Sequence, residues 1–440
     1  MTDFSSAIID TPLWILILTM SCLYVLVVGG LRAFLRPAIV GNLDPLNIII
    51  FTSLGPALIG LALTPFLIKS ISPSYFLILA FMCLWLLVIR IAGKPAKIDL
   101  TDKMGTDFQV ILLFLTILIV IANVTINMII PGKIPLLTEG GGLYSRFDAT
   151  QNSRLLSWLS LGTAPMAGLL YAVTENPKVR KFAVIAVSVQ VAENLLFANK
   201  GAIFAIVFIL LNSLFIASTR NDRKRFNKIG RALIGSVLIV VLLVPFYFSF
   251  IGFGSGSTAM AGLVVRVLGG FDQLIYASQF DLLQHAGVDS LMKINLFEYQ
   301  FMPFFKALLS VQFDYSTIGQ YVIEAATGQY IDGPFTFPNS NLILETVFTS
   351  GKYLGMTLFL LELSGFYWLR RAALKGPITP LSLAFVQTVV LAPASLFYSG
   401  QEWVTCTIFV FFTVIAAAIL SKLWRPFCEI LRTYSAVAIE

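Results

Sequence analysis

The sequence predicts an all-α polytopic integral membrane protein. Of its 440 residues, 58% are hydrophobic and only 12% are charged, whereas a soluble globular domain carries about 25% charged residues. Long apolar runs recur along the chain, and each approaches the roughly 20 residues that a helix needs to cross a bilayer. Basic residues gather in alternate loops between these runs, which is the pattern of cytoplasmic loops.

About eleven apolar runs meet the length requirement for a transmembrane helix. The predicted spans are residues 12–31, 46–66, 75–91, 110–130, 155–171, 182–197, 201–217, 232–250, 353–369, 381–397 and 403–421. The sixth and seventh runs are short and lie almost end to end, so they form either a tight hairpin or one broken helix. The first run follows a segment without the basic region of a signal peptide, so we expect it to stay in the membrane.

The positive charges predict the orientation. One set of loops carries the basic clusters at 90–103, 178–181, 220–231, 370–375 and 422–432. Because cytoplasmic loops carry an excess of Lys and Arg, the N-terminus is predicted to lie outside and the C-terminus inside. The net charge of +7 therefore reflects membrane topology, and it is poor support for nucleic-acid binding.

The outer side carries two loops that are longer than simple connectors. We divide the chain into N-terminal transmembrane helices (1–250, with the first outer loop at 131–154), a large outer loop with amphipathic helices (251–352), and C-terminal transmembrane helices (353–440). A loop of this length with its own structure is usually functional. Its segment at 297–313 is dense in aromatic residues, which predicts a segment on the membrane surface or packed over the spans.

The passage from the large loop into the next span carries the first candidate site. Asn341 stands in a stretch whose Ser and Asn side chains can cap a helix. Glu345, Thr349 and Lys352 follow at spacings of four and seven, so they would share one helix face. This row is either the polar face of a capped helix or one wall of a site. In the second case Asn341 and Lys352 line a substrate cavity, and Glu345 is a candidate for proton removal.

Three outer arginines have the chemistry to bind phosphate. Arg146 and Arg154 flank a polar stretch after a triple glycine, and Arg266 lies in an apolar run, where a guanidinium needs a counter-anion. Arginine forms bidentate hydrogen bonds with phosphate oxygens, so a diphosphate headgroup at the bilayer surface would supply that anion. The alternative is a set of structural ion pairs with Asp148 or Asp272.

Four further residues are candidates. Glu193 lies in an apolar run, where a charge costs about 3 kcal/mol, and Lys200 shares its face if the helix continues. The two either neutralise each other or line a cavity, and we favour the cavity. His285, the one histidine, is either a surface residue or a catalytic group that titrates near neutrality. Glu402, in the short outer loop SGQEW, is a second carboxylate in reach of an outer site.

The chain resembles the Wzy-type O-antigen polymerases, a family of oligosaccharide repeat-unit polymerases in bacterial membranes. The resemblance rests on the span layout, the two outer loops with arginines, the NKG joint at 199–201, and the passage at 338–355 that begins PNSNL. The sequence departs from the family's pattern of a glycine eleven positions after each loop arginine, since Ser157, Pro165 and Ala277 stand there.

The resemblance implies a GT-C-like glycosyltransferase fold in the bacterial inner membrane, with its site on the periplasmic face. Such proteins polymerise undecaprenyl-diphosphate-linked oligosaccharide repeat units into a surface polysaccharide, without a metal or another cofactor. The implied partners are those lipid-linked oligosaccharides, the lipid bilayer and a chain-length-regulating membrane protein, with no nucleic acid. The implied roles are the base for Glu345, ahead of His285, and diphosphate binding for Arg146, Arg154, Arg266 and Lys200.

Other functions fit the same layout. A ligase-type enzyme, which transfers finished polymer to another acceptor, would use a loop histidine, and His285 could supply it. A transporter or lipid flippase would favour Glu193 and Lys200 as functional charges, although the chain shows no internal repeat. A non-enzymatic scaffold is the third alternative, and the polar residues gathered on the outer face argue against it.

Overall fold

The computed structural model describes residues 13–67, 72–132, 134–135, 153–197, 211–219, 281–285, 295–309, 341–391 and 399–437, together with residues 274, 277–278, 318 and 322. Over these residues the chain forms helices and no β-strand, with one isolated bridge between Asp102 and Ile378. Four of the described helices are long and apolar enough to cross a membrane. The prediction of an all-α membrane protein is therefore confirmed.

The four membrane-length helices are α5 (Pro73–Ala92), α6 with its π-helical end η2 (Thr106–Ile129), α8 (Arg154–Val173) and the first part of α21 (Gly400–Trp424). The remaining helices are α2 (Leu13–Phe34), α3 (Pro45–Ile49), η1 (Ile50–Leu54), α4 (Gly55–Leu67), α9 (Pro177–Leu196), α14 (Leu282–His285), α15 (Leu296–Leu309), α17 (Leu342–Ser350), α18 (Lys352–Ala373), α19 (Pro380–Phe385) and η4 (Val386–Leu391), and α21 continues to Val437. Residues 211–219 are also helical, whereas the first part of the predicted span at 201–217 and all of the predicted span at 232–250 lie outside the described residues.

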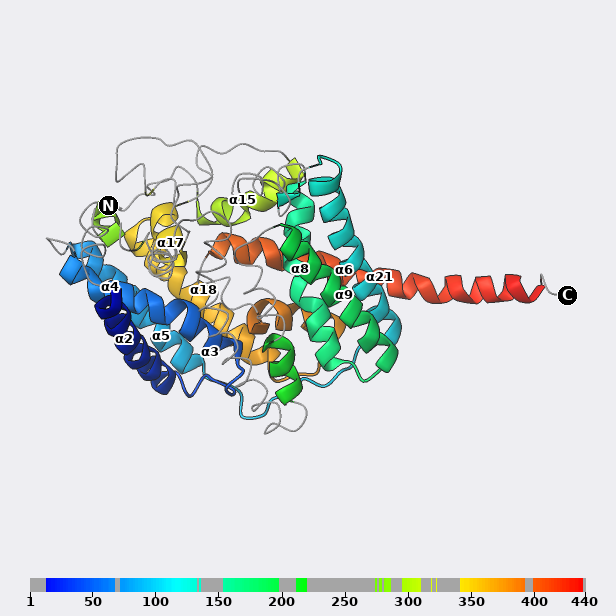
Figure 1. Ribbon diagram of the computed structural model, residues 1–440, viewed down its shortest axis with the longest axis horizontal. Coiled ribbons are helices and arrows are strands. Elements are labelled where there is room, and N and C mark those ends of the chain that lie inside the picture. The colour runs from blue at the N-terminus through cyan, green and yellow to red at the C-terminus, as the bar shows by residue number, and fades with distance from the viewer. Residues whose placement is uncertain are drawn as a thin grey trace. The chain divides into compact units, whose positions relative to one another are not determined.

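The chain divides into two compact units, and each combines segments that are distant in the sequence. Unit 1 consists of Met1–Lys94, Arg231–Arg371 and Ala392–Val404. Unit 2 consists of Pro95–Gly230, Ala372–Leu391 and Thr405–Glu440. Figure 1 shows α2, α4, α5, α17 and α18 of unit 1, and α6, α8 and α9 of unit 2.

Unit 1 is held together by contacts of α18 with earlier helices. The Phe359 ring meets Phe81 of α5 edge-on, with centroids 4.9 Å apart, and both side chains are fully buried. At the other end of α18, Arg370 forms a buried ion pair with Asp44 at 2.6 Å. Asp44 also accepts a hydrogen bond from the Leu46 backbone N–H at 2.9 Å, so it caps α3. One buried carboxylate therefore joins the start of α3 to the end of α18.

The single helix expected from Asn341 through Lys352 is wrong. Helix α17 ends at Ser350, and the next residue, Gly351, has φ +75°, a conformation that side chains disfavour. Helix α18 then begins at Lys352 and packs back on α17, so closely that a Cβ at Gly355 would lie 2.7 Å from the Val347 Cα atom. Lys352 therefore starts a new helix, and it does not extend a row with Glu345.

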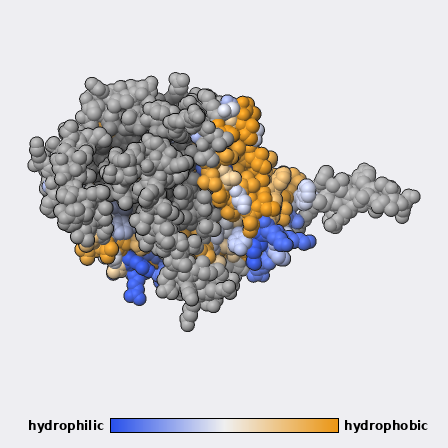
Figure 2. Space-filling view, viewed as in Figure 1, coloured by the Kyte–Doolittle hydropathy of each residue, from blue (hydrophilic) through white to orange (hydrophobic). Residues whose placement is uncertain are grey.

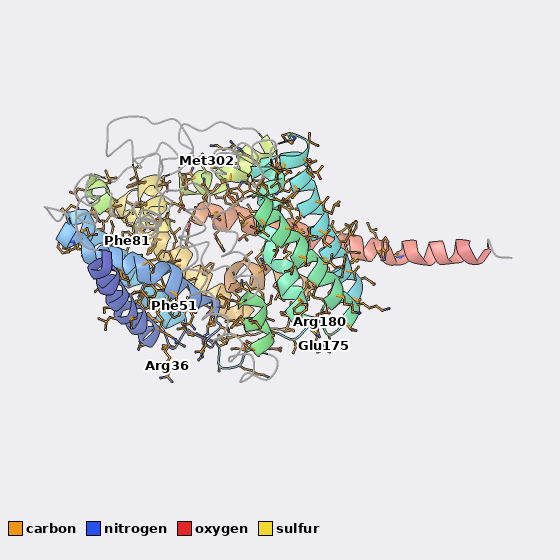
Figure 3. All side chains as sticks on the ribbon, viewed as in Figure 1. Arg36, Phe51, Phe81, Glu175, Arg180 and Met302 are labelled. Carbon is orange, nitrogen blue, oxygen red and sulfur yellow. The ribbon has the colours of Figure 1, made fainter. Side chains whose placement is uncertain are left out.

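Unit 2 contains a bundle of α6, α8 and α9, which contact one another pairwise. Polar side chains fasten its predicted cytoplasmic end, where Thr174 donates to Gln109 at 2.8 Å and Gln109 donates to Asp102 at 2.7 Å. Figure 3 shows Glu175 and Arg180 at the connection between α8 and α9. In the preceding loop, the Thr101 N–H and hydroxyl donate to Asp99 and lower the pKa of its carboxyl.

Large apolar side chains stay exposed along the membrane-length helices. They include Phe76, Leu87 and Ile91 of α5, Phe114, Leu118 and Ile121 of α6, and Phe412, Ile415 and Ile419 of α21. Figure 2 shows hydrophobic side chains in continuous orange areas, separate from the blue hydrophilic ones. Exposed apolar patches of this kind mark contact surfaces, and their position on membrane-length helices agrees with lipid contact.

Candidate carboxylate site

Helix α15 is the described part of the aromatic segment in the large loop. It begins with a capping box, since the Glu298 N–H donates to Asn295 Oδ1 at 2.9 Å and the Asn295 N–H donates to Glu298 Oε2 at 3.1 Å. Phe297 is exposed and stacks on Phe301, with ring centroids 4.3 Å apart. Met302, labelled in Figure 3, is buried, so one face of α15 packs against other parts of unit 1.

The buried face of α15 carries polar contacts to two other helices. The Gln300 amide Nε2 donates to both carboxylate oxygens of Glu362 in α18, at 2.9 and 3.0 Å. The Gln401 amide, in the first turn of α21, donates to the Tyr299 carbonyl of α15 at 2.9 Å. Helix α15, from the predicted large loop, is thus fastened to a carboxylate in the predicted span at 353–369.

Glu345 of α17 forms the second carboxylate of the site. Its side chain is fully buried, and Ser399 Oγ donates to Oε1 at 2.7 Å. The Gln401 backbone N–H donates to Oε2 at 3.3 Å. Because the N-terminus of a helix carries a partial positive charge, the Glu345 carboxylate stabilises the start of α21.

Gly400 brings the two carboxylates into one site. A Cβ atom at this position would lie 2.7 Å from Gln300 Nε2 and 2.8 Å from Glu345 Oε2. The amide that holds Glu362 and the carboxylate of Glu345 therefore face the same backbone position. We call Glu345, Glu362, Gln300 and Ser399 the carboxylate site: Gln300 and Glu345 face Gly400, Glu362 accepts from Gln300, and Ser399 donates to Glu345. All of its members belong to unit 1.

The two carboxylates differ in access. Glu345 has no exposed surface and accepts hydrogen bonds from Ser399 and Gln401. Glu362 is partly exposed and accepts from the Gln300 amide. A carboxylate in reach of a ligand hydroxyl can remove its proton. A ligand can therefore reach Glu362 more easily than Glu345. The buried contacts of Glu345 are those of a positioning residue.

The structure shows where four predicted site residues of unit 1 lie. Asn341 is fully buried and caps α17 by accepting from the Ile343 N–H at 2.9 Å, so the capping prediction is confirmed. Lys352 is half-buried at the start of α18. Glu402 lies in the first turn of α21, so its placement in a loop is wrong. His285 is the last described residue of α14, and its side chain is outside the described part of the chain.

The remaining predicted site residues are in unit 2 or lie outside the described residues. Glu193 and Arg154 are in unit 2, Glu193 buried in α9 and Arg154 exposed at the first position of α8. Helix α9 ends at Leu196, so the condition for Glu193 and Lys200 to share a face is not met. Arg146, Lys200 and Arg266 lie outside the described residues, and their roles stay predictions.

The sequence analysis missed Glu362, Gln300 and Ser399. Glu362 interrupts the apolar run at 353–369, and a charge there is as costly as at Glu193, so the same argument could have identified it. Gln300 and Ser399 gave no comparable signal, because uncharged polar residues are common beside spans. Their role depends on the packing of α15 and the first turn of α21 against α17 and α18.

Comparison of the chain with protein-family models, with curated proteins and with solved structures finds no match. Within the described residues, no group of three or more His, Cys, Asp or Glu side chains could hold a metal ion. The fold and the site together define an all-α membrane protein with a pair of carboxylates beside helix α15.

Proposed function

We propose that the protein polymerises undecaprenyl-diphosphate-linked oligosaccharide repeat units into a surface polysaccharide, as its resemblance to the O-antigen polymerases implies. It does so in a bacterial inner membrane, on the periplasmic face, with about eleven spans in a GT-C-like arrangement, the N-terminus outside and the C-terminus inside. The acceptor is the sugar hydroxyl of another lipid-linked repeat unit.

The observation that supports the proposal best is the packing of α15 against the carboxylate site. Gln300 of α15 holds Glu362 through both carboxylate oxygens, and Gln401 holds the α15 carbonyl of Tyr299. An extracytoplasmic loop helix over a carboxylate in a span is a suitable arrangement for a lipid-linked substrate, whose reactive sugar lies at the membrane surface. The exposed aromatic ring of Phe297 suits contact with lipid or sugar.

The reaction is a single glycosyl transfer. The bond between the donor sugar's anomeric carbon and the diphosphate oxygen breaks, and undecaprenyl diphosphate leaves with the electron pair. The acceptor hydroxyl oxygen forms the new bond to that carbon and releases its proton to a carboxylate base. Glu362 is the base in this proposal, since it is partly exposed, and Glu345 positions the first turn of α21.

Cations on the outer side would stabilise the charge that builds on the leaving diphosphate. We propose this role for Arg146, Arg154, Arg266 and Lys200 on the strength of the sequence alone.

The test compares two matched variants in membrane vesicles supplied with the lipid-linked repeat unit of the host. Glu362→Gln keeps the shape of the side chain and removes the base, so we expect polymer formation to fall about 10²–10⁴-fold. Glu298→Gln, an exposed change in α15 that keeps the capping box, serves as the control and should retain activity. Equal polymer from both variants would exclude Glu362 as the base.

A further inference from the structure

Unit 2 contains a second buried carboxylate, Glu193, which is not part of the carboxylate site of unit 1. Glu193 of α9 is 5% exposed. Asn123 Nδ2 of α6 donates to its Oε1 atom at 2.6 Å. Ser160 Oγ of α8 lies 2.6 Å from Oε1 and 2.6 Å from Oε2. Three helices thus contribute one polar side chain each to a single buried cluster.

The two contacts of Ser160 favour a protonated Glu193. A hydroxyl carries one hydrogen, and an ionised carboxylate carries none. The single hydroxyl hydrogen could serve both oxygens of an ionised carboxylate only as a shared, three-centre bond, yet both distances are 2.6 Å, within the range of a full O–H···O hydrogen bond. A proton on the carboxyl satisfies both contacts, since Oε2–H then donates to Ser160 Oγ and the Ser160 hydroxyl donates to Oε1. The Asn123 amide completes the set at Oε1.

Glu193 forms no ion pair with the described residues of the α6–α8–α9 bundle. Ser160 is six residues beyond Arg154, about 9 Å along the axis of α8, and Arg154 is exposed. The other charged or titratable side chains of the three helices stand further along them, near their opposite ends: Asp107 of α6, Tyr171 of α8, and Lys178, Arg180 and Lys181 of α9. A charged Glu193 would therefore be buried without a described counter-charge.

Hydrogen bonds connect this cluster to the outer end of α8. Asn127 Nδ2 donates to Asn123 Oδ1 at 2.6 Å, and the Ser153 N–H donates to Asn127 Oδ1 at 2.7 Å. Ser157 also donates to Asn123 Oδ1, at 3.2 Å. Ser153 is the N-cap of α8 and lies at the end of the predicted first outer loop, 131–154. The polar chain thus leads from Glu193 to the residue where the predicted outer surface begins.

We propose that Glu193, with Ser160 and Asn123, is a proton-binding site within the membrane part of the protein. The ligand is a proton taken from the outer side, which binds at Oε2 and is held by Ser160. When the proton leaves, the carboxylate remains buried in the α6–α8–α9 bundle, and the bundle loses stability. The site therefore couples the proton concentration on the outer side to the packing of these three helices.

The test is infrared difference spectroscopy of the full-length protein in lipid nanodiscs at neutral pH. The spectrum of Glu193→Gln is subtracted from that of the wild type, so that other carboxyl groups cancel. We expect the difference to contain the C=O stretch of a protonated carboxylic acid, with a shift on transfer to deuterated water. The two stretches of an ionised carboxylate in its place would overturn the proposal.

A second variant tests the role of Ser160. Ser160→Ala removes both hydrogen bonds of the hydroxyl, so the acid C=O stretch assigned to Glu193 should move to higher frequency. An unchanged band would overturn the proposed contact. Thermal unfolding gives an independent readout, which also serves if Glu193→Gln fails to fold: the wild type should lose stability as the pH is raised through the release of this proton. Absence of that loss would contradict the proposal.

Discussion

Replacement of Glu345 by alanine separates a positioning role from a catalytic one. The change removes the acceptor of two buried donors, the Ser399 hydroxyl and the Gln401 N–H, whose residues are 7% and 9% exposed. Each buried donor left without a partner costs about 1–3 kcal/mol, so we expect Glu345→Ala to lower the free energy of unfolding by about 2–6 kcal/mol. The lost negative charge at the start of α21 adds about 0.3–1 kcal/mol.

The assay is denaturant unfolding of the purified chain in detergent, followed in parallel with polymer formation. Glu362→Gln is the matched comparison, because Glu362 is partly exposed and accepts from the Gln300 amide. We expect it to cost less than about 1.5 kcal/mol while it abolishes most of the activity. An unchanged unfolding free energy for Glu345→Ala, together with a complete loss of polymer, would refute the positioning role and return Glu345 to the role of base.

Three further predictions concern single residues. Gly351→Ala places a side chain at φ +75° and should destabilise the α17–α18 connection by about 1–3 kcal/mol; a neutral effect on unfolding would show that the turn relaxes. Arg370→Met leaves the fully buried Asp44 without its cation and should cost about 3–5 kcal/mol in unfolding experiments, whereas the double variant with Asp44→Asn should recover part of that loss; a double variant as unstable as the sum of the two single ones would contradict the pairing. Arg154→Ala should reduce polymer formation with the protein still present in the membrane, while Lys178→Ala, on the predicted cytoplasmic side, should not; equal activity of the two variants would remove Arg154 from the diphosphate site.

The helices could be predicted because each follows from composition. Predicted spans such as 75–91 and 155–171 coincide with α5 and α8 within a few residues, since a run of apolar residues between polar loops has one stable state in a bilayer. The break at Gly351 was missed for a physical reason. A glycine inside a helical pattern is compatible with both continuation and a sharp turn, and only the packing of Gly355 on Val347 decides between them.

The candidate site could be predicted in part. The sequence identified Glu345 by its position after a capping stretch, and the structure adds that the side chain is fully buried against the start of α21. Glu193 was recognised as a costly charge, but its partners Ser160 and Asn123 lie 33 and 70 residues away. Contacts over such distances depend on the packing of helices, which periodicity and local motifs do not specify.

The proposed function is the extension of lipid-linked glycans. The most direct measurement uses the purified protein in liposomes with an undecaprenyl-diphosphate-linked repeat unit from its own host, and gel analysis of the lipid-linked products. We expect a ladder of lengthened glycans without added nucleotide or metal. Transfer of the substrate across the bilayer with no ladder would contradict it and would favour a flippase, and transfer of finished polymer to another acceptor would favour a ligase.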